Sequence, residues 1–201
     1  MTASPAQARP RDGASTRARI EREALRLFAS RGVEGTSIKD ISHAVGVADA
    51  ALYRHFPSKE EIARALFSAH YGAIATRIEA IGRQGLAFEK TVAALVDLLC
   101  GLFDDEPDVF AFVLLNQHAH LRFVPDEANV VTALRDIVFA AQTRGEIASG
   151  DPDFVSAMAL GTVLQPAVFK LYGRLKGPMR SHARAMTQAA LLVLRAPSIR
   201  G

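Results

Sequence analysis

The side chains with the most distinctive chemistry lie between residues 36 and 61, in the run TSIKDISHAVGVADAALYRHFPSKEE. A tyrosine, an arginine and a histidine stand together at Tyr53, Arg54 and His55, and Lys59 follows them. Side chains of these types make hydrogen bonds to phosphate oxygens and to base edges of a duplex. The sequence shows no nucleophile motif, phosphate-binding loop or cluster of metal ligands. The chemistry indicated is therefore recognition rather than catalysis.

A short helix is expected to begin at Ser37, because Ser37 and Asp40 have the spacing of a capping box. Apolar residues then recur on one face of this helix, at Ile38, Ile41 and Val45. Gly46 is expected to end it, since glycine adopts the left-handed backbone of a helix C-terminus at little cost.

A second short helix is expected directly afterwards, with Leu52 and Phe56 facing inward at i, i+4. Pro57 would stop this helix, and a further capping box at Ser58 and Glu61 would begin the next one. Two short helices joined by a glycine turn, the second with a small, polar and aromatic outer face, are typical of a DNA-reading helix-turn-helix.

The expected DNA contacts lie on that outer face and at two helix N-termini. They are Thr36, Ser37, Ala48, Asp49, Ala50, Tyr53, Arg54, His55 and Lys59. Oriented amides at a helix N-terminus attract phosphate, as does the cation of Lys59. A purely structural role, in capping or in buttressing the helix, is the alternative for these residues.

The sequence resembles the N-terminal domain of the TetR/AcrR family of bacterial transcriptional regulators over about residues 20–62. The residues that carry the resemblance are LYRHFPSKEE, the preceding Gly46-Val47, and Ala24, Leu27, Phe28 and Gly32. The sequence departs from the family at Ala48, where a capping Ser or Thr is usual, and at Ala50, where Gly is frequent. The first departure weakens that helix start by about 1 kcal/mol unless Asp49 substitutes for the cap.

The resemblance implies an all-α fold, in which a three-helix DNA-binding domain precedes a helical domain for effector binding and dimerisation. We expect a disordered arm over residues 1–14, a helix-turn-helix domain over 15–62 and an effector-binding and dimerisation domain over 63–201. The expected helices cover residues 15–31, 37–46, 48–56, 58–82, 88–104, 108–122, 126–144, 152–172 and 178–195.

Composition limits the class of protein. Hydrophobic residues make up 49% and charged residues 22% of the 201 residues, as in ordinary globular proteins. The single cysteine, Cys100, excludes an internal disulfide framework. We find no apolar run of the ~18 residues that a membrane span needs, and no signal peptide, so we expect a cytoplasmic protein. Residues 1–62 hold ten Lys/Arg against eight Asp/Glu, so the helix-turn-helix prediction depends on pattern rather than charge.

A small-molecule site is expected in the second domain, where polar groups are interspersed among bulky aromatic ones. The expected lining residues are Phe67, His70, Tyr71, Phe103, Phe112, Asn116, His118, Phe139, Gln165 and Phe169. Ordinary core packing is the alternative for most of the aromatic rings. His118 and His120 lie about 200° apart around a helix and cannot share one metal ion, so no metal site is expected.

These features predict a transcriptional repressor that binds a palindromic DNA operator as a homodimer. By the resemblance, the last two helices would form a four-helix bundle with the second subunit, and a small, mainly apolar effector would release the operator. A helix-turn-helix regulator without an effector, an activator and an all-helical enzyme are the alternatives. We expect no catalytic residues and no cofactor.

Overall fold

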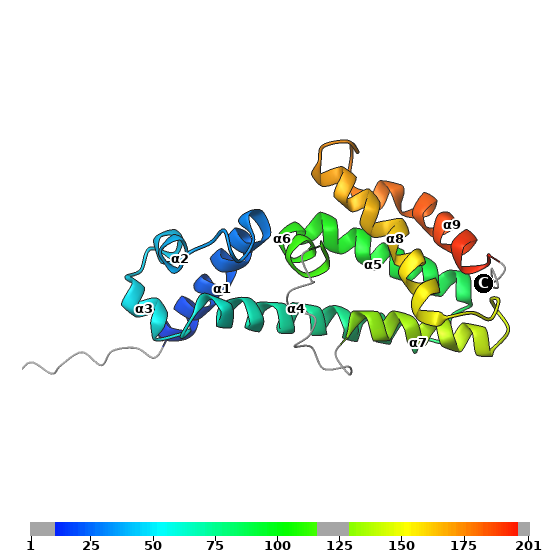
Figure 1. Ribbon diagram of the computed structural model, residues 1–201, viewed down its shortest axis with the longest axis horizontal. Helices are drawn as coiled ribbons and strands as arrows, with labels where there is room; N and C mark the ends of the chain where they lie inside the picture. The colour runs from blue at the N-terminus through cyan, green and yellow to red at the C-terminus, as the bar shows by residue number, and fades with distance from the viewer. Residues whose placement is uncertain (1–10, 116–128, 197–201) are drawn as a thin grey trace, which may run out of the picture. The chain divides into compact units, whose positions relative to one another are not determined.

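The structure is a computed structural model that describes residues 11–115 and 129–196, with side chains from residue 14 onward (Figure 1). Every described element is a helix, which confirms the predicted all-α fold. The elements are α1 (Arg11–Arg31), α2 (Ile38–Val45), α3 (Asp49–Tyr53), α4 (Lys59–Gly82), α5 (Phe88–Asp105), α6 (Pro107–Phe110), the π-helical segment η1 (Ala111–Leu115), α7 (Val130–Thr143), α8 (Pro152–Leu171), the 3-10 turn η5 (Met179–His182) and α9 (Ala183–Leu194).

The chain divides into two compact units, and the division lies within α4, between Leu66 and Phe67. Helix α4 therefore contributes its first turns to one unit and its remaining turns to the other. Helix α1 begins at Arg11, so residues 11–14 are helical rather than part of the expected arm. The rest of that arm, residues 1–10, lies outside the described residues.

The first unit is organised around apolar side chains that its four helical segments bury. Fully or nearly fully buried residues come from α1, α2, the α3 region and the start of α4, at Ile20, Ala24, Phe28, Ile41, Val45, Leu52, Phe56 and Ile62. These are the positions at which the sequence shows helical apolar periodicity. The core thus fixes α2 and α3 against α1 and leaves their other faces to solvent.

The turn between α1 and α2 is closely packed at Gly35. A Cβ atom at this position would lie 2.3 Å from the backbone carbonyl oxygen of Arg31. Because backbone cannot move aside cheaply, we expect Gly35→Ala to lower the free energy of unfolding by about 1–3 kcal/mol, as overpacking does elsewhere. Urea unfolding followed by circular dichroism measures this change. An unchanged transition midpoint would show that the backbone at Arg31 can move aside without a loss of stability.

The second unit is a helical bundle in which α8 packs against both α7 and α9, and α9 packs on α5 (Figure 1). Cys100 of α5 and Met186 of α9 meet in its interior, with their sulfur atoms 3.7 Å apart. Burial raises the pKa of the Cys100 thiol to about 11, and nearby Asp97 and Asp104 act in the same direction. A thiol that stays protonated is unreactive. Cys100 thus packs as a small core residue.

The start of η5 is fixed to the end of α5 by two carboxylates. Asp104 accepts hydrogen bonds from the backbone amides of Met179 and Arg180, at 2.8 and 3.0 Å. Asp105 binds the guanidinium of Arg180, which lowers the pKa of this carboxyl. The acidic end of α5, which the sequence marked only as a helix break, therefore caps the beginning of the last helical segment.

The segment after α5 differs from the single helix expected over residues 108–122. Helix α6 ends at Phe110, and residues Ala111–Leu115 form a π-helical turn. Residues 116–128 lie outside the described residues. Pro166 does not end α8, because the helix covers Pro152–Leu171 on both sides of this proline.

Candidate DNA-binding surface and effector cavity

Helix α2 has the start and the end that its sequence predicts. The Ser37 amide donates to Oδ2 of Asp40 at 2.8 Å, and the Asp40 amide donates to Oγ of Ser37 at 3.2 Å. Hydrogen bonds from the hydroxyl and the amide of Ser37 lower the pKa of the Asp40 carboxyl. Gly46 has φ 75° and ends the helix in the left-handed region. The predicted capping box and glycine turn are both confirmed.

Helix α3 is shorter than the expected 48–56 and lacks a side-chain cap. Its N-cap residue, Ala48, offers no hydrogen-bonding group, and the helix covers only Asp49–Tyr53. The Asp49 carboxylate does not replace that cap but accepts a hydrogen bond from the hydroxyl of Ser42 on α2. Asp49 therefore joins the two helices, and its expected contact with DNA stays a prediction.

The outer face of α3 collects four of the expected DNA contacts. Ala48, Ala50, Tyr53 and Arg54 are all exposed, and Tyr53 exposes 53% of its surface. Leu52 lies on the opposite side and is fully buried. The face offers a small surface near the start of the helix and an aromatic hydroxyl and a guanidinium near its end. This arrangement suits hydrogen bonds to phosphates and base edges.

Two arginines of α1 hold the helix-turn-helix in place. The Arg17 guanidinium lies over the Phe56 ring, 4.2 Å from its centroid, and donates to the carbonyl oxygen of His55 at 3.4 Å. Arg19 donates to the carbonyl oxygen of Val45 at the end of α2. His55 itself is half-buried beside these contacts. Both guanidinium groups thus satisfy carbonyl groups at helix ends, as C-terminal capping requires.

Thr36 and Lys59 stabilise the turn between α1 and α2, which differs from their expected role as phosphate contacts. Thr36 is 1% exposed, and its hydroxyl donates to the carbonyl oxygen of Gly32 at 2.8 Å. The Lys59 ammonium donates to the carbonyl oxygens of Val33 and Thr36, at 2.9 and 3.2 Å. Ser37, in contrast, is exposed at the N-terminus of α2. Lys59 therefore connects the start of α4 to this turn.

A larger side chain at Ala50 is expected to change the DNA sequence that the protein prefers. Ala50 is exposed on the outer face of α3, where a duplex would lie closest to the bases. Ala50→Gln adds an amide that can pair with adenine, so selection from a random duplex library should return a different consensus. Replacing the exposed Ala18 of α1 with Gln serves as the matched control. An unchanged consensus for Ala50→Gln would show that this face does not read bases.

Four aromatic residues expected in the effector site pack together in the interior of the second unit. The rings of Phe67 and Tyr71 stack at 5.0 Å between centroids, and Phe112 meets Phe67 edge-on at 6.2 Å. Phe103 makes a further edge contact, with Phe110 at 5.1 Å. The Tyr71 hydroxyl donates to Oδ1 of Asn129 at 3.1 Å, and burial raises the pKa of this phenol. These four rings form packed core.

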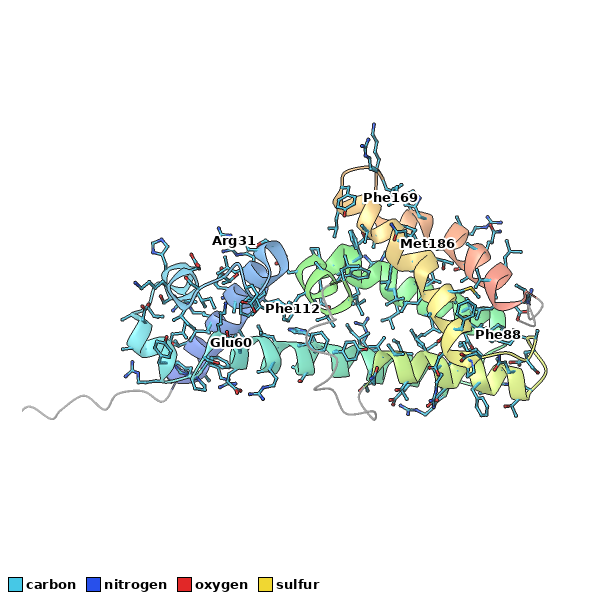
Figure 2. All side chains as sticks on the ribbon, in the orientation of Figure 1. Arg31, Glu60, Phe88, Phe112, Phe169 and Met186 are labelled. Carbon is cyan, nitrogen blue, oxygen red and sulfur yellow. The ribbon has the colours of Figure 1, made fainter. Side chains whose placement is uncertain are left out.

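The remaining expected lining residues do not come together. Phe139 is 59% exposed and Phe169 is 47% exposed; the outward position of Phe169 is visible in Figure 2. Gln165 is exposed and His70 is half-buried. Both phenylalanines belong to helices whose inner stripe is formed by other residues, so the expectation from residue type does not hold for them. Asn116 and His118 lie outside the described residues.

A cavity of about 60 Å³ lies between α5, α7, α8 and α9 in the second unit. We call it the inner cavity. It is lined by Phe88, Val92, Leu95, Val96, Leu99, Leu134, Ile137, Val138, Ser156, Ala159, Leu160, Val163, Ala190 and Leu194. Ser156 is the one polar residue of this lining, and its hydroxyl donates to the carbonyl oxygen of Asp153 at 3.0 Å. The chemistry of the cavity is that of a hydrocarbon site.

No pattern in the sequence indicated that these residues line a cavity. Its residues have the same helical spacing as a filled core, and only the meeting of four helices leaves a space between them. Within the described part of the chain, no group of three or more His, Cys, Asp or Glu side chains is arranged to hold a metal ion.

Comparison with known proteins identifies the helix-turn-helix. Residues 20–66 match the model of the family described as bacterial regulatory proteins, tetR family. Residues 20–66 thus form a helix-turn-helix of the TetR type. The matched residues contain α2, α3 and the buried apolar positions of α1, and they include all of the exposed candidate DNA contacts. The rest of the chain, residues 1–19 and 67–201, lies outside this family model.

Similar proteins have been characterised in several bacteria. The chain is 34% identical over 73 residues to the HTH-type transcriptional repressor KstR2 of Rhodococcus jostii, a match that covers 36% of each chain. It is 46% identical over 54 residues to the HTH-type transcriptional regulator TcmR of Streptomyces glaucescens, covering 27% of this chain and 24% of that one. The chain thus spans about a third or less of the length of these relatives.

A solved structure resembles nearly the whole fold. The transcriptional regulator FadR from Bacillus subtilis, in complex with stearoyl-CoA, superposes with a TM-score of 0.72 at 20% sequence identity. The match covers 88% of this chain and 97% of that one. At this identity the likeness concerns the fold, which both units of the present chain share with that regulator.

Proposed function

We propose that the protein is a transcriptional repressor that binds an operator in duplex DNA as a homodimer and is released by a small, mainly apolar effector. The observation that carries the proposal is the exposed outer face of α3, presented by a capped helix-turn-helix whose inner face is buried. Repression rather than activation is favoured because the relative KstR2 is named a repressor. The proposed DNA contacts are Ser37, Ala48, Ala50, Tyr53 and Arg54.

Dimerisation is proposed through the outer faces of α8 and α9. Large apolar side chains are exposed along these helices, at Phe154 (62%), Met158 (40%), Phe169 (47%) and Leu192 (75%). The intervening exposed positions are small, such as Ala157 and Ala189. Apolar surface of this extent marks an interaction site, and small residues let helices approach closely. A second copy of the same face would give an isologous four-helix interface.

Helix α8 also has the length and composition of a membrane span, with 20 residues and a mean hydropathy of 1.4. Only 17% of its most apolar window is buried within the chain. A subunit interface accounts for this exposed apolar surface, because α8 packs against α7 and α9 of the same unit and begins at an Asp151 N-cap, as helices of globular proteins do. We therefore propose a location in the cytoplasm, where the operator is accessible.

An effector is proposed to bind in the second unit, since the inner cavity is formed by helices of that unit alone. Coupling of about 1–3 kcal/mol between the two sites, a change of about 5–150-fold in operator affinity, would suffice for regulation. A regulator without an effector would carry the same α3 face. The two candidates differ in whether any small molecule lowers operator affinity.

The test of the proposed function is recovery of an operator from genomic DNA. Purified protein is incubated with sheared DNA of the source organism, and bound fragments are sequenced and footprinted. We expect a small set of fragments that share a palindrome, with half-sites about 34–36 Å apart or a multiple of it. Fragments recovered in proportion to their abundance would contradict the proposal. A transcription assay on the recovered promoter then distinguishes repression from activation.

A further inference from the structure

The inner cavity adjoins an open groove, and two side chains line both. The outer groove, of about 400 Å³, is formed by the α4–α5 turn and the end of α7, with Gly85, Thr91, Arg144 and Glu146 among its lining residues. Phe88 and Ile137 line the outer groove and the inner cavity alike. Phe88 stands at the start of α5 and is 4% exposed (Figure 2). These two side chains thus stand between an apolar compartment and a polar one.

The two compartments differ in chemistry. The inner cavity offers only apolar side chains and one serine whose hydroxyl is already used. Its volume is that of about two water molecules, at roughly 30 Å³ each, so it accommodates only a short alkyl segment. A longer chain must pass between Phe88 and Ile137 and continue into the outer groove.

The charges of the outer groove disfavour an anionic head group. Arg144 lines this groove, and it binds Glu146 at 2.8 Å, an ion pair that raises the pKa of the arginine. In the neighbouring groove along α4 and α7, Arg83 is likewise paired with Glu79, at 3.2 Å, and the Asp136 carboxylate is paired with Arg135, at 2.8 Å. An anion would compete with Glu146 for Arg144, whereas a neutral hydroxyl or amide can donate to the carboxylate and accept from the guanidinium.

We propose that the second unit binds a single-chain amphiphile with an uncharged, hydrogen-bonding head group, such as a long-chain alcohol or amide. Its chain end occupies the inner cavity, its chain passes between Phe88 and Ile137, and its head lies beside Arg144 and Glu146. The inference rests on the proposed function in that the amphiphile is the effector, but its location and head-group charge are tested separately.

The same passage has a direct connection to α4. Gly82 ends this helix, and a Cβ atom there would lie 2.9 Å from Cγ1 of Ile137. A chain that displaces Ile137 therefore presses on the last turn of the helix that continues into the first unit. Through this contact, binding of the amphiphile would shift the last turn of α4, which is the kind of helix movement that a ligand-operated switch needs.

The test compares two probes that differ only in their head groups, 1-decanol and decanoic acid, by calorimetric titration of the full chain. We expect 1-decanol to bind about tenfold or more tightly than decanoate, because decanoate must compete with Glu146 for Arg144, whereas the alcohol can bind both groups. Glu146→Gln should reduce that preference, since it frees Arg144 to bind an anion. Tighter binding of decanoate to the unaltered protein would overturn the head-group assignment.

The location is tested by filling the inner cavity. Ala159→Leu places three further carbon atoms in the space, and each excluded methylene weakens binding by about fourfold, so decanol affinity should fall by tens of fold. Ala73→Leu, at an exposed position of α4, is the matched control and should bind decanol normally. Unchanged affinity in a folded Ala159→Leu variant would place the site elsewhere.

A fluorescent variant tests the location independently of any cavity-filling change. The chain has no tryptophan, so Phe88→Trp provides a single reporter at the passage, and Ala18→Trp, at an exposed position of α1, a control reporter in the first unit. We expect 11-bromo-1-undecanol to quench the fluorescence of the reporter at the passage and not that of the control reporter. Equal quenching of both reporters would contradict the site.

Operator titrations on the same samples distinguish this inference from the proposed function. If the protein binds the operator but not the amphiphile, only the present inference is contradicted. If the protein does not bind the operator, the proposed function is contradicted.

Discussion

Leu192→Glu is expected to convert the protein to a monomer and to weaken operator binding by about a hundredfold or more. Leu192 exposes 75% of its surface in the last turn of α9, within the proposed dimerisation face. In an isologous interface, the glutamate carboxylate of each copy would be buried against the apolar face of the other copy. Burial of an unpaired charge is strongly unfavourable. A monomer engages one half-site only and loses the avidity factor, about 10²–10⁴, that two linked modules provide.

Sedimentation velocity and operator titration of the same preparation measure the two effects. Val131→Glu is a suitable control, because Val131 is also an exposed apolar residue, at 40%, but lies on α7. The control should remain dimeric and bind the operator normally. If Leu192→Glu remains a dimer, the interface is not formed by α8 and α9, and the exposed residues of those helices need another explanation.

Lys59→Ala is expected to destabilise the first unit and to weaken binding to every DNA sequence alike. The ammonium group donates to the carbonyl oxygens of Val33 and Thr36, and hydrogen bonds to charged groups contribute about 1.5–3 kcal/mol. Without it the turn before α2 is loosened, so the exposed N-terminus of α2 at Ser37 is less well positioned. Thermal unfolding of the protein and its operator affinity should therefore both decrease.

The salt dependence of binding separates this structural role from a phosphate contact. Loss of a phosphate contact lowers the slope of log K against log salt by about 1. Because two carbonyl groups hold the Lys59 ammonium, we expect the slope to change little. Lys39→Ala removes an equal charge from the exposed side of α2 and should leave the unfolding transition unchanged. If Lys59→Ala leaves the melting temperature unaltered and lowers the slope by about 1, Lys59 is a phosphate contact, as its position in the sequence suggested.

Local features of the helix-turn-helix were predictable from the sequence because they depend on residues a few positions apart. The capping box of Ser37 and Asp40 spans three residues, and the left-handed turn at Gly46 depends on that glycine alone. The roles of Thr36, Asp49 and Lys59 were not predictable in the same way. Lys59 finds its acceptors 23 and 26 residues earlier in the chain, a pairing that only the folded unit creates.

In the second unit, the spacing of apolar residues predicted the helices but not the inner cavity between them. Aromatic type alone suggested Phe139 and Phe169 as lining residues, yet both are exposed, while Phe67 and Tyr71 stack in the core. The inner cavity exists because the apolar stripes of four helices meet without filling the volume between them. Such a mismatch depends on side-chain shape at the meeting point, which periodicity does not encode.

The most direct test of the account is a salt titration of operator binding. A fluorescently labelled operator duplex and a scrambled duplex of the same composition are each titrated with the protein at several salt concentrations. The account predicts that the operator binds at least about a thousandfold more tightly, and that both affinities fall linearly on a logarithmic salt scale. Equal affinity for the two duplexes, or no binding even at low salt, would contradict it.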